Sequence, residues 1–404
     1  MIFVGIDWAE AHNDACIVDE HGRVLGKQRV PDGVDGLGRL HAMLAEHAQD
    51  PSDVVIGIEI DRGLLVDAMV AAGYAVYAIN PMAASRYRDR HATSRAKSDP
   101  GDAKMLADLV RTDRHNHRKV AGDTESASAI KVLARAHQDL IWSRQRQVNH
   151  LRNQLREFYP GALAAFGADL AASDAVVVLE RAPSPLQGGA LSASQIGALL
   201  RRGGRQRNID KRAGEIRDAL GAPQLEASKL VAEAYAASVA ASVQIIASMN
   251  QQIDRLAAQL SQGFRSHPDA EIYLSLPGLG DVLGARALAE FGDDRTRYAN
   301  PKGRKAYAGT APITRASGTR MIVLARLARN KRLADACYLW AFAALNSSPG
   351  CRRYYDARRS RGQTHHQALR AVANRLVGIL HGCLEHRTPY REDVAWPPQL
   401  EAVA

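Results

Sequence analysis

The chain has 404 residues, of which 46% are hydrophobic and 24% charged, so we expect a globular protein of two or three domains and exclude a disordered or fibrous chain. No window approaches the roughly 20 uncharged apolar residues of a membrane span, and the N-terminus lacks the basic start of a signal peptide, so we expect a cytoplasmic protein without a membrane partner. Four scattered cysteines fit that compartment, and a net charge of +10 favours a polyanionic partner such as nucleic acid.

Predicted strands and helices alternate along the first 120 or so residues. Short apolar runs between polar turns predict an antiparallel meander of three strands over Ile2–Asp7, Asp14–Val18 and Val24–Val30. The pattern then predicts a helix from Val34, a strand Val54–Glu59, a helix Leu64–Ala72, a strand Ala75–Ile79, a basic loop, and a helix from Asp99 to about Arg114. This is the element order of the ribonuclease H-like fold, and a generic α/β domain is the alternative.

Two later stretches have the spacing of long helices. Apolar residues recur at steps of three, four and seven from Ile130 to Phe158, and again through Ile245, Met249, Ile253, Leu256 and Leu260. They predict a coiled-coil arm whose helices pair within one chain or across two chains. Between them, the run Arg201–Arg207 is interpreted as a basic loop. We therefore expect an α/β domain over 1–122, a helical arm with a basic loop over 123–264, a mainly α domain over 265–390 and a tail over 391–404.

Four acids have positions that suit a metal site. Asp7 ends the first predicted strand, Glu59 ends the fourth, and Asp99 and Asp102 lie three apart at a helix start, which places both on one helical face. The element order brings the ends of the first and fourth strands side by side. A pair of Mg²⁺ ions would neutralise the clustered carboxylates and hold the attacking and leaving oxygens of phosphodiester chemistry. Taken singly, Asp99 could be a helix cap and Asp102 a favourable charge near the helix start, and Asp61 competes for the place of Glu59.

A serine in the C-terminal third is a candidate nucleophile. Ser317 lies beside Gly318 in the segment Y-A-G-T-A-P-I-T-R-A-S-G, and Arg315 and Arg320 flank it. A serine beside cations could attack a phosphodiester and form a phosphoserine. Most loop serines are turn formers, so the residue by itself leaves both roles open.

Several further segments could contact the phosphates of a nucleic acid. The turn L-P-G-L-G precedes a predicted helix, so backbone amides near Gly278 and Gly280 could hold a phosphate, or the turn could simply join two helices. Cationic clusters lie near both candidate sites, and the alternative for each cluster is a solvated helix face. The candidate cations are Arg86, Arg88, Arg90, Lys97, Arg315, Arg320, Arg326, Arg329, Lys331, Arg352 and Arg353.

Together these motifs resemble the insertion sequence 110 group of DEDD transposases, which is related to the DNA invertases of pilin genes. The resemblance covers nearly the whole chain in the family's order. One departure is Ile60-Asp61, because a small residue or proline often follows the glutamate, and this leaves Asp61 as an extra or alternative ligand. The segments that carry the resemblance are V-G-I-D-W-A, I-G-I-E-I, K-S-D-P-G-D-A-K-M-L-A-D, L-P-G-L-G and Y-A-G-T-A-P-I-T-R-A-S-G.

The resemblance implies an N-terminal RuvC-like domain similar to Holliday-junction resolvases, a coiled-coil arm, and a mainly α C-terminal transposase domain. By carry-over, Asp7, Glu59, Asp99 and Asp102 bind Mg²⁺, and Ser317 joins covalently to DNA. Members of the family form dimers and tetramers, and several use a structured non-coding RNA that pairs with donor and target double-stranded DNA.

The expected function is therefore transposition of the chain's own element by strand cleavage and exchange. The first alternative is a site-specific DNA invertase that uses no guide RNA. The second is a Holliday-junction-type nuclease that needs the four acids but not Ser317, and the third is a nucleic-acid-binding protein whose active site has decayed.

Overall fold

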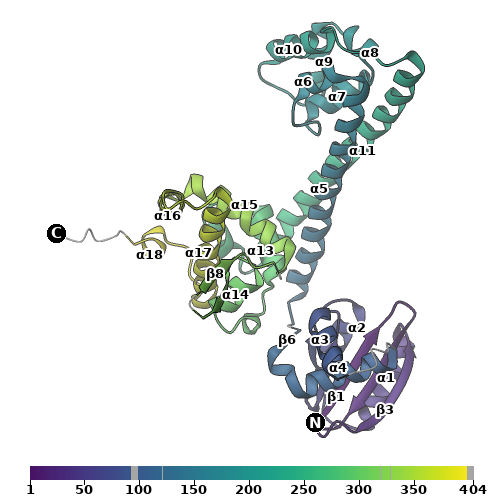
Figure 1. Ribbon diagram of the computed structural model, residues 1–404, viewed down its shortest axis with the longest axis vertical. Coiled ribbons are helices and arrows are strands. Elements are labelled where there is room, and N and C mark those ends of the chain that lie inside the picture. The colour runs from purple at the N-terminus through teal and green to yellow at the C-terminus, as the bar shows by residue number, and fades with distance from the viewer. Residues whose placement is uncertain (92–98, 121, 319, 328, 398–404) are drawn as a thin grey trace, which may run out of the picture. The chain divides into compact units, whose positions relative to one another are not determined.

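The computed structural model describes the chain apart from residues 92–98, 121, 319, 328 and 398–404. Its contacts divide the chain into two units (Figure 1). The first unit comprises Met1–Asp123 with Asp294–Arg297, and the second comprises Thr124–Asp293 with Tyr298–Ala404. The first is built on a mixed sheet, and the second is mainly helical.

A six-stranded sheet forms the centre of the first unit, in the order β3-β2-β1-β4-β5-β6. β1, β4 and β5 are parallel neighbours, whereas β2 and β3 at one side and β6 at the other pair antiparallel. The predicted order of strands and helices up to β5 is confirmed. The strands are β1 (Ile2–Trp8), β2 (His12–Val18), β3 (Val24–Pro31), β4 (Val54–Ile58), β5 (Ala75–Ala78) and β6 (Arg118–Lys119).

Alternation of side chains along β1 gives the sheet two distinct faces. On one face, Val4 and Ile6 pack with α1 (Val34–Ala45) and α2 (Leu64–Ala71). On the other face, Phe3 packs with α4 (Asp99–Asp113). Gly5 and Asp7 follow Phe3 at steps of two, so they lie on the α4 face as well.

Helix α4 lies unusually close to the strands because two glycines carry no side chain there. A Cβ on Gly5 would lie 1.9 Å from the Ala103 carbonyl oxygen, and one on Gly57 would lie 2.6 Å from Val110 Cγ1. Gly5 and Gly57 are register partners in β1 and β4. The backbone of α4 therefore rests on the strands themselves, at a separation that only glycine permits.

The segment predicted as a basic loop before α4 is in fact a helix up to His91. α3 spans Pro81–His91, and the Asn80 side chain accepts a hydrogen bond from the Met82 amide at 2.8 Å at its start. Asn80-Pro81 is thus a helix start, which the sequence interpretation took only as the end of a strand. Arg86, Arg88 and Arg90 consequently project from a helix.

The second unit contains two long helices that lie side by side, α5 (Glu125–Phe158) and α11 (Lys229–Arg265) (Figure 1). At 1.5 Å per residue they are about 51 and 56 Å long. The sequence left open whether these helices pair within one chain or across two chains. In the structure they pair within one chain. Ile245 was expected in the apolar stripe, but it is 45% exposed, and its neighbour Ile246 is buried in the core instead.

Hydrogen-bonded polar residues interrupt the seam between α5 and α11. The Ser242 hydroxyl donates to Gln154 Oε1 at 3.1 Å, and Arg144 donates to Asn250 Oδ1 at 2.7 Å. Ser242 is buried, as is Gln154. A count of apolar residues alone misses such positions; of the predicted stripe on α11, Ile253 and Leu260 are buried as expected and Ile245 is not.

Helix α11 is also the one helix among the described residues that is long and apolar enough to cross a membrane, with a mean hydropathy of 1.6 in its most apolar window. This is a property of length and composition only. The helix packs along α5 and contributes Val239, Val243 and Ile246 to a buried core.

Residues 160–225 form a small helical cluster between the two long helices. Arg201 and Arg202 belong to the last turn of α9, and Arg202 and Arg205 pair with Glu180 at 3.1 Å and Asp174 at 2.6 Å. The run interpreted as a basic loop is therefore partly helical and partly neutralised. The helices are α6 (Pro160–Phe166), α7 (Ser173–Arg181), α8 (Pro185–Gly189), α9 (Ala193–Arg202) and α10 (Ile209–Gly221).

The C-terminal part packs around Trp340, whose indole N–H donates to the Pro277 carbonyl at 2.9 Å. A hairpin of β7 (Ile313–Ser317) and β8 (Arg320–Leu324) is its only sheet among the described residues. The four cysteines of the chain are buried and free. The helices are α12 (Ala270–Ser275), α13 (Asp281–Phe291), α14 (Pro301–Tyr307), α15 (Lys331–Ser347), α16 (Pro349–Ser360), α17 (His365–His386) and α18 (Glu392–Ala395).

The close approach of α4 predicts a strong effect of a single methyl group. Gly5→Ala should destabilise the first unit by about 1–3 kcal/mol or more, because the new Cβ collides with backbone that cannot move aside. Gly38→Ala in α1 is the matched control, since a Cβ there meets nothing within 4 Å and alanine favours a helix. Urea unfolding of both variants measures the difference, and equal stabilities would contradict the role of Gly5.

Candidate active site

A row of charged side chains crosses the sheet on the α4 face. Asp7 of β1 is the register partner of Asp14 of β2, which is in turn the partner of Arg29 of β3. Glu59 directly follows β4, one step beyond the last parallel pair, Ile6 and Ile58. Directly paired residues of neighbouring strands point to the same side of a sheet, so Asp7 has a carboxylate on each side of it in the row.

The first turn of α4 adds two more carboxylates above this row. Asp99 and Asp102 are both in that turn, and Asp102 is buried whereas Asp99 is exposed. The pKa of Asp7 is raised to about 6, first by burial and then by the negative charges of Asp102, Asp99, Glu59 and Asp14. The four acids singled out in the sequence are thus within electrostatic reach of one another.

Two arginines partly balance these charges. Arg88 of α3 pairs with Asp102 at 2.7 Å. Arg29 pairs with Asp14 at 2.8 Å and also reaches Asp99 at 3.2 Å. Arg88, one of the cations predicted to contact nucleic acid, contacts the acid cluster in this structure.

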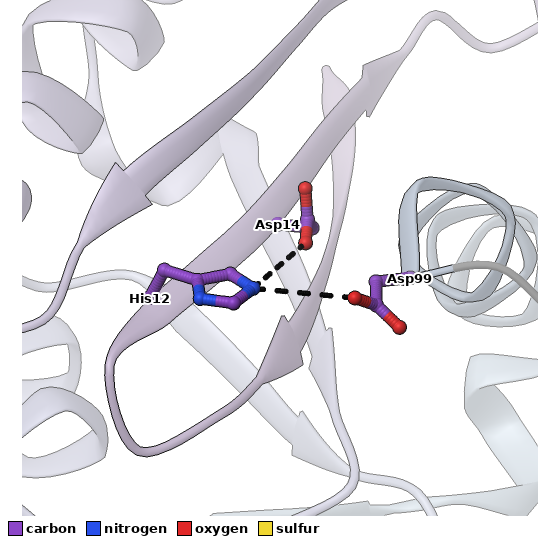
Figure 2. A group of neighbouring side chains, drawn as sticks. All are labelled: His12, Asp14 and Asp99. Atoms are coloured by element: carbon purple, nitrogen blue, oxygen red, sulfur yellow. Dashed lines mark ion pairs between the residues drawn. The ribbon is translucent and has the colours of Figure 1, made fainter.

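Figure 2 shows a second group of possible ligands, His12, Asp14 and Asp99, whose side chains converge from β2 and the start of α4. His12 Nε2 lies 3.8 Å from Asp14 and 4.0 Å from Asp99. This nitrogen is buried and has no hydrogen-bond partner among the described residues. A nitrogen and two carboxylates suit a transition metal better than Mg²⁺, and Asp99 is common to this group and to the cluster around Asp7.

Asp14, His12 and Arg29 were not predicted as site residues. Asp14 could have been found, because a short hairpin between the first two predicted strands pairs residue 7 with residue 14. His12 and Arg29 lie near the sheet end for the same reason, but nothing in their local sequence distinguishes them.

The two competing acids, Glu59 and Asp61, have different surroundings in the structure. Glu59 acts on the pKa of Asp7, whereas Asp61 forms an ion pair with Arg118 of β6. The carboxylate set around Asp7 consists of hard oxygen donors, which are the ligands that Mg²⁺ and similar divalent cations prefer. The residues present therefore fit a divalent metal.

Ser317 ends strand β7 and is exposed. It is the register partner of Arg320, and Arg315 lies two residues before it on the same strand. Both relations put side chains on the same face of a hairpin, so Ser317, Arg315 and Arg320 share one face. In the described parts of the chain, no histidine or carboxylate forms a hydrogen bond with the Ser317 hydroxyl.

The turn L-P-G-L-G has a packing role in the structure. Gly278 has φ +78°, and a Cβ there would lie 2.5 Å from the Ala344 backbone nitrogen in α15. Gly280 is exposed just before α13, whose first residue Asp281 is held by Arg265 at 2.8 Å. The Asp281 carboxylate thus adds a negative charge near this helix start, although it does not cap the helix.

The remaining predicted cations have varied surroundings. Arg86, Arg90, Lys331, Arg352 and Arg353 are exposed, and Arg352 pairs with Asp356. Arg326 donates to the Ala311 carbonyl at 3.4 Å, and the stem of Arg329 packs on Gly309. Lys97 lies outside the described residues.

Comparison with known proteins matches both halves of the chain to transposases. Residues 4–160 match a DEDD transposase profile, which implies that the α/β unit is ribonuclease H-like, and residues 270–356 match the profile "Transposase IS116/IS110/IS902 family". The four acids belong to the first profile and Ser317 to the second.

Full-length relatives support the same assignment. The chain is 45% identical to the "Mini-circle putative transposase for IS117" of Streptomyces coelicolor, over 100% of this chain and 98% of the relative. It is 29% identical to the IS900 "uncharacterized 42 kDa protein" of Mycobacterium paratuberculosis, over 96% and 97%. The chain belongs to the IS110 family of insertion-sequence transposases, enzymes that catalyse DNA cleavage and strand transfer.

Proposed function

We propose that this transposase exchanges DNA strands by Mg²⁺-dependent chemistry in which Ser317 is the nucleophile, with an RNA guide selecting the sites. The observation that carries the proposal is the gathering of carboxylates around Asp7, whose pKa they help to raise to about 6. So many like charges at one place are costly for the fold alone, and they are what a divalent cation requires.

Asp7, Glu59, Asp99 and Asp102 are the residues that would hold the metal. When bound, Mg²⁺ supplies positive charge that stabilises the attacking and leaving oxygens of a phosphodiester. Asp102 and Asp99 would bind the metal through the carboxylate oxygens that now form ion pairs with Arg88 and Arg29. The two arginines would then be available for phosphate oxygens of the DNA.

Ser317 would attack one phosphodiester of the DNA. Its hydroxyl loses a proton to water, Oγ bonds to phosphorus, and the bond from phosphorus to the departing deoxyribose oxygen breaks. That oxygen accepts a proton from water and leaves as a hydroxyl. Arg315 and Arg320, on the same hairpin face as Ser317, would stabilise the charge on the phosphate oxygens. Attack by a hydroxyl of a second strand reverses these steps and rejoins the DNA.

The acids and Ser317 belong to different units of the chain, so the reaction requires assembly of two half-sites. Ser317 is exposed, and in the described residues no histidine or carboxylate is hydrogen-bonded to it as a general base. This supports a serine whose active site is completed by residues from elsewhere. We propose a homodimer or homotetramer in which Ser317 of one copy meets the acids of another. The double-stranded donor and target DNA would bridge the copies.

A guide RNA would explain how a protein that mainly contacts phosphates selects a sequence. The net charge of +10 and exposed cations such as Arg86, Arg352 and Arg353 favour backbone contacts, which carry no base information. Sequencing of RNA that co-purifies with the full-length protein tests this. We expect one discrete structured RNA encoded beside the gene, and its absence from active protein would favour an invertase with fixed sites.

The geometry around Asp7 predicts different effects for two neighbouring acids. Glu59→Gln should weaken Mn²⁺ binding, measured by calorimetry, by roughly tenfold or more and abolish cleavage, because even loss of an outer-shell partner costs about that much. Asp61→Asn is the matched control and should change affinity by less than about twofold, because Asp61 pairs with Arg118. The opposite order of effects would assign the ligand to Asp61.

Ser317→Ala should abolish recombination and the covalent protein–DNA adduct, while DNA binding persists. The adduct is detected by denaturing electrophoresis of reactions that have not been treated with protease. The exposed Ser347→Ala is the control and should behave as the unaltered protein. Mixing Ser317→Ala with Asp102→Asn should restore part of the activity if the half-sites meet between copies. Normal cleavage by Ser317→Ala would instead indicate a resolvase-like nuclease.

A further inference from the structure

A cavity of about 370 Å³ lies between the serine hairpin and two C-terminal helices, within the size range of ligand sites. Strand β8 forms one wall with Val323 and Leu324. Helix α16 contributes Tyr354 and Arg358, and helix α17 contributes Arg370. No sequence motif pointed to this cavity, because its walls come from three separate segments.

The charge of the cavity favours an anion. Two arginines line it and no aspartate or glutamate does. Arg358 lies over the Tyr354 ring at 4.9 Å from its centre and donates to the Tyr354 hydroxyl at 2.6 Å. Among the described residues, neither Arg358 nor Arg370 has a carboxylate within ion-pair distance. Positive charge without an internal counterion is what a phosphate-binding wall requires.

An unsatisfied polar atom points to a ligand with hydrogen-bond donors. Gln363 lines the cavity, and its Oε1 is buried without a hydrogen-bond partner in the described structure. Buried acceptors in native proteins are nearly always paired, so a bound molecule is the natural source of the missing donor. Gln367 and Asn374 add amide groups to the same lining. Such amides match the donors and acceptors on the edges of nucleobases.

We propose that this cavity binds one unpaired nucleotide of the DNA strand that Ser317 attacks, with the phosphate at Arg370, the base against Tyr354 and Arg358, and the base edge at Gln363. The proposal rests on the proposed role of Ser317. We choose the DNA strand that Ser317 attacks because the cavity wall is β8, and β8 is paired with β7, the β-strand that carries Ser317.

The hairpin gives the position of the nucleotide along the strand. Ser317 pairs with Arg320 at one end and Ile313 pairs with Leu324 at the other, four residues away. The first cavity residue on β8, Val323, pairs with Thr314, three residues from Ser317, so at about 3.4 Å per residue the cavity begins roughly 10 Å from Ser317 along the hairpin. At about 3.4 Å per nucleotide of a stacked strand, the bound nucleotide lies about three positions from the phosphate that reacts.

The test measures binding separately from the serine chemistry. Full-length Ser317→Ala protein is titrated with fluorescein-labelled oligothymidylate at several salt concentrations, by anisotropy. Arg370→Gln in this background should weaken binding about tenfold and reduce the slope of log affinity against log salt by about 0.7, because one phosphate contact is lost. Gln363→Leu, of similar size, should weaken binding without changing the slope. Ala371→Met, which fills the cavity without removing charge, should act like Gln363→Leu.

Arg361→Gln is the matched control, an exposed arginine at the end of α16 that does not line the cavity, and it should leave affinity unchanged. Thermal unfolding confirms that each variant is folded. Photo-crosslinks from 4-thiothymidine in the oligonucleotide should map to peptides containing Tyr354 or Gln363.

Crosslinks elsewhere, equal effects of Arg370→Gln and Arg361→Gln, or stronger binding of oligouridylate of the same length would overturn the proposal. Normal recombination by Ser317→Ala alongside crosslinks in the cavity would instead remove the serine mechanism and leave nucleotide binding in place.

Discussion

The direct contact between helix α4 and the paired glycines of β1 and β4 is the constraint on which the acid site depends. A side chain at Gly5 or Gly57 would push the helix away by the thickness of a methyl group or more. Because the helix rests on the strands, its first turn brings Asp102 and Asp99 within reach of Asp7. The positions of the acidic side chains therefore depend on two glycines, Gly5 and Gly57.

Close placement of carboxylates has an electrostatic cost that the chain offsets locally. Arg88 of α3 pairs with Asp102, and Arg29 of β3 pairs with Asp14. Asp7 is left between the others with a raised pKa. These ion pairs lower the electrostatic cost of gathering the carboxylates at one place.

Local patterns predicted the four acids and the order of elements because both depend on short-range spacing. They missed α3, since Asn80-Pro81 can end a strand and start a helix equally well. They also missed the pairing of Arg88 with Asp102, which depends on how α3 packs against α4. Ser317 could not be distinguished from a turn residue by local chemistry, and only the family resemblance pointed to it. The cavity beside Tyr354 was invisible for a related reason, because its walls meet only after folding.

The polar seam between α5 and α11 has a consequence for how these helices can pair. Gln154 accepts a hydrogen bond from Ser242 and donates one to Ser238, and Gln147, one heptad before Gln154, also donates to Ser242. The polar groups form a continuous ladder along the seam, and the same hydrogen bonds would be retained if α5 of one copy exchanged its partner for α11 of another. The same residues that join the helices within a chain would then align two chains without any new contact.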